Sequence, residues 1–215
     1  MLFAILATAA CAHRPATTPS APLPAWQTLG TAKHATTTRD INPKGDTARE
    51  QALANAPAAA QRLLDATNRL ARTAPNPQHT TIVDALQRLA DAIAAVAPDQ
   101  TQAVSRVRES AARLERSSDQ STDHTELVRA GLESAGRALR AAPIPGGFDE
   151  TNIRALRLRE AADAVAREAT ALDPGTPLMN QYDTVQIALR ESTRAVYAAL
   201  GEPEPVLAVP VTASR

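Results

Sequence analysis

The sequence is short of several residue types, and each shortage excludes a class of protein. A single cysteine among 215 residues allows neither an internal disulfide framework nor a cysteine-rich zinc site. The 23 basic and 23 acidic residues cancel, so the basic surplus typical of nucleic-acid-binding proteins is missing. Aromatic residues make up 2% and glycine occurs eight times, which argues against a β-sandwich or barrel. Ala, Leu and Arg are abundant, and these strong helix formers favour an all-α fold.

Motifs that carry catalysis or hold a cofactor are also missing. The histidines are His13, His34, His79 and His124. No two histidines are four residues apart, so the HExxH pattern of zinc helices does not occur. No histidine lies three residues after a glutamate, so the Glu-x-x-His pattern of di-iron bundles does not occur either. There is no GxSxG, P-loop or GxGxxG segment. We therefore predict a non-enzymatic protein without a cofactor or metal. The acids around His124 (Asp119, Asp123 and Glu126) favour a helix start, with a weak surface cation site as the alternative.

The first eleven residues read as an export signal. Residues 2–10 form an apolar run within the roughly 7–15 residues of a signal-peptide core, and shorter than the about 20 that span a bilayer. The segment Thr8-Ala9-Ala10-Cys11 resembles the lipobox of bacterial lipoproteins. The resemblance implies that residues 1–10 are removed and that Cys11 carries the lipid that anchors the chain in the membrane. Ala12 after the cysteine implies the outer membrane in a Gram-negative organism, with the domain in the periplasm. A signal cut elsewhere, after Ala9 or Ala12, or a small buried cysteine remain the alternatives.

Residues 11–45 differ in composition from the rest of the chain. They are rich in Pro, Thr, Ala and Ser and show no apolar periodicity. Such a segment is predicted to be a disordered tether, with a reach on the order of 30 Å. A lipid anchor, a tether and a globular domain together form a coherent arrangement.

Residues 46–201 show the apolar spacing of amphipathic helices. Short loops between helices favour antiparallel neighbours, so we predict an up-and-down bundle of five to six helices without a sheet. The expected helix starts are Asp46, Asp99, Asp123, Asp149 and Thr176. Pro57 either begins the first helix or kinks a longer one. Gly201 is the expected C-cap of the last helix, and residues 202–215 are predicted to be a disordered tail.

The charged residues are mostly explained by the predicted helices. Acid-to-arginine pairs four residues apart occur at Asp65–Arg69, Asp84–Arg88, Glu109–Arg113, Glu133–Arg137, Glu150–Arg154 and Asp163–Arg167. The alternative hypothesis is an anion-binding patch near the loop 143–148. Its residues would be Arg137, Arg140, Arg154 and Arg157, together with Arg159.

These patterns support two hypotheses on function. The first is a non-enzymatic protein-interaction or scaffolding module of the bacterial envelope that binds another envelope protein through a helix face. Ile187 lies off the apolar stripe of the last helix and is weak evidence for such a face. The second is a small-molecule or cofactor-binding sensor bundle, because ligands can bind between helices. Polar residues beside the predicted seams (Thr67, Ser192 and Glu160) are its candidates.

Overall fold

The computed structural model describes residues 43–73, 78–117, 123–144 and 152–209. Within them the chain forms six α-helices and one short 3-10 helix, and no strand. The α-helices are α2 (Pro43–Arg72), α3 (His79–Val96), α4 (Thr101–Arg116), α5 (Asp123–Arg140), α6 (Ile153–Ala171) and α7 (Tyr182–Leu200). The predicted all-α fold is confirmed, with six helices. None of the described helices is both long and apolar enough to cross a membrane.

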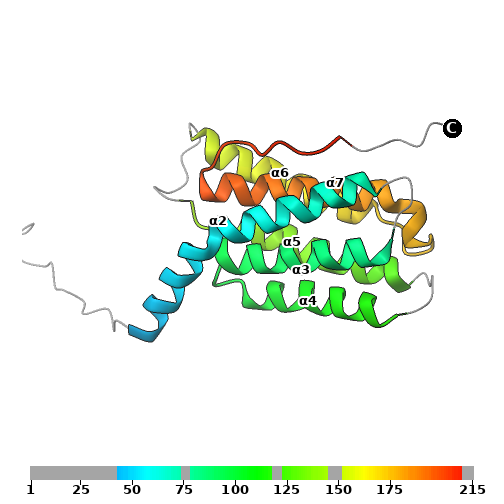
Figure 1. The fold of residues 1–215 in the computed structure, drawn as a ribbon, viewed down its shortest axis with the longest axis horizontal. Coiled ribbons are helices and arrows are strands. Elements are labelled where there is room, and N and C mark those ends of the chain that lie inside the picture. Colours follow the sequence, from blue (N-terminus) through cyan, green and yellow to red (C-terminus); the bar gives the residue numbers. More distant parts are fainter. Residues whose placement is uncertain (1–42, 74–77, 118–122, 145–151, 210–215) are drawn as a thin grey trace, which may run out of the picture. The chain divides into compact units, whose positions relative to one another are not determined.

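Three of the helices form the centre of the bundle, and three cover it (Figure 1). α3, α5 and α7 contact one another, while α2 packs against α3 and α7, α4 against α3 and α5, and α6 against α5 and α7. Consecutive helices run antiparallel. Tyr182 at the start of α7 donates a hydrogen bond to the carbonyl of Leu70 near the end of α2. The three central helices therefore run in the same direction.

The central helices bury apolar residues at matching spacings of four, three and four. These residues are Ile82, Leu86, Leu89 and Ile93 in α3, Val128, Leu132, Ala135 and Leu139 in α5, and Val185, Leu189 and Val196 in α7. Ser192 takes the remaining place in α7. Small residues allow close approach between helices. At Gly131 an added Cβ would lie 3.0 Å from the Cβ of Ser110, so α4 and α5 pack closely there.

Several helix ends differ from the predicted ones. α2 begins at Pro43, ahead of Asp46, and continues through Pro57. Among its described side chains, burial begins at Ala56, and the helix changes direction near that point (Figure 1). The N-cap of α4 is Gln100 rather than Asp99. The N-cap of α6 is Asn152. Its Oδ1 accepts hydrogen bonds from the backbone amides of Arg154 and Ala155, at 3.0 and 3.4 Å. Asp149, the predicted start of this helix, lies outside the described residues.

The last helix begins later than the sequence suggests. Thr176 does not cap it, because its hydroxyl donates to Asp173 at 2.8 Å. A 3-10 turn, η1 (Leu178–Gln181), intervenes before α7 begins at Tyr182. Gly201 has φ 75°, which is the left-handed conformation of a C-cap glycine, so this prediction is confirmed.

Residues 202–209, assigned above to a disordered tail, instead run back along the bundle in an extended segment (Figure 1). The amide of Ala208 donates to Asn68 Oδ1 of α2 at 2.7 Å, and Arg190 of α7 donates to the carbonyl of Ala208. Arg194 of α7 lies 3.1 Å from the carboxylate of Glu204. These contacts fix the segment over α2 and α7, which the apolar pattern could not predict because they are polar.

Candidate functional site

The arginines of the predicted anion patch have separate environments. Arg137 donates to Ser134 at 3.3 Å and lines a groove between α4 and α5. Arg140 pairs with Asp163 of α6 at 2.6 Å. Arg154 donates to the carbonyl of Gly201 at 3.3 Å. Arg157 lines a different groove, between α6 and α7, and Arg159 is exposed on α6.

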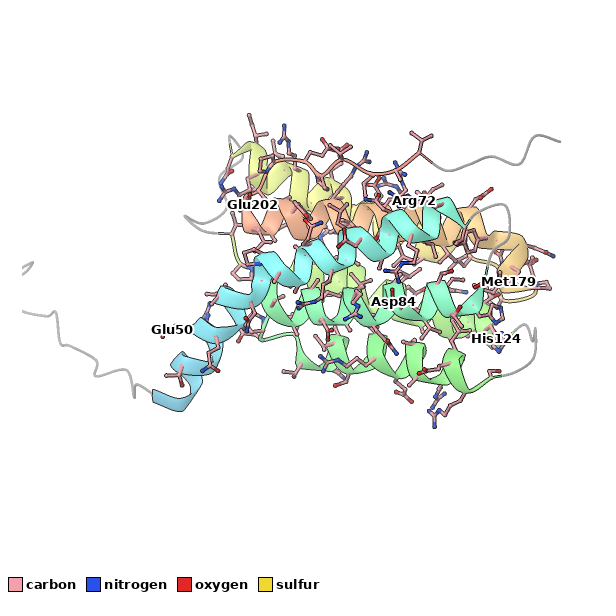
Figure 2. The ribbon with its side chains drawn as sticks, in the orientation of Figure 1. Glu50, Arg72, Asp84, His124, Met179 and Glu202 are labelled. Atoms are coloured by element: carbon pink, nitrogen blue, oxygen red, sulfur yellow. The ribbon has the colours of Figure 1, made fainter. Side chains whose placement is uncertain are left out.

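The groove that Arg157 lines has a cavity volume of about 480 Å³. We call it the α6–α7 groove. Its residues are Arg157, Glu160, Ala161, Ala164, Arg167 and Glu168 of α6, Ile187, Glu191, Arg194 and Ala198 of α7, and Glu202 and Glu204 of the C-terminal segment. Alanines and Ile187 supply its apolar part, and three arginines and five glutamates its charged part. Glu202 marks the end of the bundle opposite to His124 and Met179 (Figure 2).

Charges in the α6–α7 groove fall into two groups. Arg194 is paired twice, with Glu191 at 2.6 Å and with Glu204 at 3.1 Å. Arg157, Glu160, Arg167 and Glu168 of α6 take part in no ion pair or side-chain hydrogen bond with other described residues. These four side chains of α6 are therefore available to a partner, as is Glu202 of the C-terminal segment, which likewise has no such contact with other described residues.

The unpaired state of Arg167 results from competition between helices. The predicted pair joins it to Asp163, four residues before it. Asp163 instead contacts Arg140 of α5, and this pair joins two helices. The same exchange occurs between α2 and α3, where Arg69 contacts Asp84 at 3.0 Å rather than Asp65. Among the predicted pairs, Asp84–Arg88 and Glu109–Arg113 do form, at 3.3 and 2.7 Å.

Large apolar side chains are exposed on the two helices that border the groove. Ile153 and Leu156 of α6 are 64% and 47% exposed, and Ile187 of α7 is 44% exposed. Ile153 and Leu156 lie on the turns of α6 that carry Arg157 and Glu160, on the face opposite to its buried residues. Apolar surface beside unpaired charges is the composition of a protein-interaction surface.

His124 is buried. The weak surface cation site, which was the alternative to a helix start, therefore does not have its histidine on the surface. The side chain of His124 is 1% exposed, and its Nε2 bonds to Ser117 Oγ. Its Nδ1 is buried without a partner among the described residues. The ring of His79 contacts it edge to face, with ring centroids 5.0 Å apart. Burial, and then the neighbouring His124, lower the pKa of His79 below its ordinary value.

Two imidazoles make an incomplete metal site. A protein site for zinc usually supplies three or four ligands. No group of three or more His, Cys, Asp or Glu side chains gathers anywhere in the described part of the chain. Asp119 lies outside that part.

The polar residues proposed for a sensor bundle bond mainly within the protein. Thr67 and Thr193 are buried and join α2 to α7 through a hydroxyl–hydroxyl bond of 2.9 Å. Ser192 donates to the carbonyl of Ala188 at 2.8 Å. Glu160 is exposed in the α6–α7 groove rather than in the core.

No protein-family model, curated protein or solved structure matches this chain. Its function must therefore be argued from its own residues. Cys11 and the rest of the predicted signal and tether lie outside the described residues. The site that the described residues support best is the α6–α7 groove.

Proposed function

We propose that this chain is an exported, lipid-anchored protein whose helical bundle binds another protein through the α6–α7 groove and catalyses no reaction. The lipid anchor is proposed from the segment that ends at Cys11 and resembles a lipobox. The composition of residues 11–45 supports a tether between anchor and bundle.

One observation carries the binding role: exposed apolar residues lie beside unpaired charges along α6 and α7. Ile153, Leu156 and Ile187 supply the apolar area. Helices that dock on a surface usually place apolar anchors in a groove and charged residues around it. The α6–α7 groove has both components, and its length follows two neighbouring helices.

The lining of this groove supports binding rather than catalysis. It consists of arginine, glutamate, alanine and isoleucine side chains. No hydroxyl, thiol or imidazole group lies among them, so a mechanism based on serine, cysteine or histidine has no counterpart in the groove. Glu191, which is partly shielded from solvent, is held by Arg194 in an ion pair.

The anchor is tested by replacing Cys11 with serine in the full chain. Cells expressing the wild type should incorporate labelled fatty acid into the protein, and the protein should sediment with membranes. The Cys11→Ser variant should lose the label and move to the soluble fraction. A wild type without label would refute the lipid anchor while leaving the binding role intact.

The binding role is tested by a photo-crosslinking amino acid placed at Ile187 in cells. A matched control carries it at Gln87, which is exposed on α3. We expect a single adduct of defined mass from position 187 and none from position 87. The adduct should decrease when Arg157 is changed to glutamate, because the charge order of the groove is then altered. Equal labelling from both positions would contradict a role for the groove.

A further inference from the structure

We propose that the partner of this face is a second copy of the chain, bound with the two α6 helices antiparallel. The inference rests on the proposed binding role of the α6–α7 groove. It names the occupant, and the charge order along α6 is the observation that carries it.

The four unpaired charges form two sets on α6. Arg157 and Glu168 are eleven residues apart, about three helical turns, so they lie on the same side of the helix. Glu160 and Arg167 are seven residues apart, about two turns, and share the other side. Ala164 lies between the two sides. Each side thus carries one arginine and one glutamate.

A twofold rotation perpendicular to α6 reverses the order of these residues. Arg157 of one copy then faces Glu168 of the other, and Glu160 faces Arg167. The two sets have midpoints at positions 162.5 and 163.5, which differ by about 1.5 Å along the helix axis. One axis beside Ala164 therefore serves both sets and produces four ion pairs.

Other arrangements fit the charges less well. Two parallel α6 helices would bring each side of one helix against the other side of its partner, so Arg157 would reach Glu160 only across an offset of three residues, about 4.5 Å along the axis, against about 1.5 Å in the antiparallel pair. A uniformly basic or acidic partner would meet as many like charges as unlike ones. The small side chain of Ala164 at the axis allows the two helices to approach closely. The exposed Leu156 and Ile153 then pack near the end of the other α6 instead of facing water.

The pairing of two α6 helices through the face around Ala164 is tested with a single engineered thiol. In the full chain with Cys11→Ser, Ala164→Cys places a cysteine beside the proposed axis. We expect oxidation to produce a disulfide-linked dimer that reduction reverses. The control Ala130→Cys carries a more exposed thiol on α5 and should remain monomeric. Equal cross-linking of both variants would overturn the proposed geometry.

Charge reversal tests the ion pairs independently of the thiol. Sedimentation of the full chain should give a dissociation constant for the dimer, which Arg157→Glu or Glu168→Arg alone should raise about tenfold, or about 1.4 kcal/mol. The double variant R157E/E168R exchanges the two charges and should restore wild-type association. Arg106→Glu makes the same charge change on α4 and should have no effect. A double variant as weak as the single ones would overturn the charge argument.

The outcomes separate this inference from the proposed function. A chain that stays monomeric at all concentrations, but whose position 187 still cross-links to a protein of different mass, excludes the second copy and leaves the binding role in place. A chain that shows neither association nor cross-linking refutes both.

Discussion

The hydroxyl pair between α2 and α7 permits a prediction of which of its two residues matters more. Thr193 donates its single hydroxyl proton to the carbonyl of Leu189 at 2.9 Å. It must therefore accept the proton of Thr67 in their 2.9 Å bond. Both side chains are buried, so neither can turn to water. Thr67 depends on Thr193 as an acceptor, while Thr193 keeps a partner if Thr67 is removed.

Valine replaces each hydroxyl by a methyl group of similar shape, so the substitutions isolate the bond. Thr193→Val leaves the Thr67 donor buried without its partner, and we expect a loss of about 1–2 kcal/mol in the free energy of unfolding. Thr67→Val removes only a donor and should cost about 0.5 kcal/mol. The double variant should be no less stable than Thr193→Val alone, because both polar groups of the pair are then gone.

The measurement is urea unfolding of the full chain, followed by far-ultraviolet circular dichroism. The free energies of unfolding are compared between variants whose dependence on urea concentration has the same slope. Thr170→Val is the matched control, because Thr170 also bonds to a carbonyl four residues before it but is exposed. Its cost should be close to zero. A larger loss for Thr67→Val than for Thr193→Val, or losses that simply add in the double variant, would refute the assigned direction of the bond.

Three further perturbations test other contacts of the bundle. The pKa of His79 is lowered from 6.5, so the folded state favours the neutral imidazole. The free energy of unfolding should therefore be retained above pH 6.5 and decrease as the pH falls below 6.5. His79→Gln should flatten this dependence when urea unfolding is measured at several pH values. Tyr182→Phe removes the bond to the Leu70 carbonyl and should cost about 1 kcal/mol by chemical unfolding. Gly201→Ala forces a side chain into a left-handed conformation and against the Arg154 guanidinium, so it should lower the thermal midpoint and cost about 1–2 kcal/mol.

The sequence was sufficient for the fold class because apolar spacing is a local property. Val128, Leu132 and Leu139 recur at helical intervals and are all buried. Breakers such as Pro98 and the Gly201 C-cap bound the helices where expected. Pairwise packing follows from short connections between antiparallel helices.

Helix starts were less predictable because several residues near one end can act as caps. Asp149 and Asn152 are both good N-cap residues. The choice of Asn152 places Ala155 and Leu158 in the core, and only the packed structure reveals this. Thr176 similarly has a second partner, Asp173, within its own turn.

The site was less predictable still, because it depends on which charges find partners on other helices. Four-residue spacing correctly identifies Asp163 as a partner for arginine but cannot rank Arg167 against Arg140. A signal was nevertheless present in the sequence. Ile153 and Leu156 lie off the apolar stripe of their helix, as Ile187 does on α7, and these three residues mark the exposed face.

The distribution of ion pairs explains why α6 remains open to a partner. Pairs between helices join α2 to α3, α3 to α4 and α5 to α6 in the described part of the chain, and none joins α6 to α7 there. Exposed charges are well solvated, so leaving them unpaired costs the monomer little. The same property limits what they contribute on association, and salt reduces it further. Pairing through α6 is therefore expected to be reversible, and a shared membrane surface would favour it by raising the effective concentration of the copies.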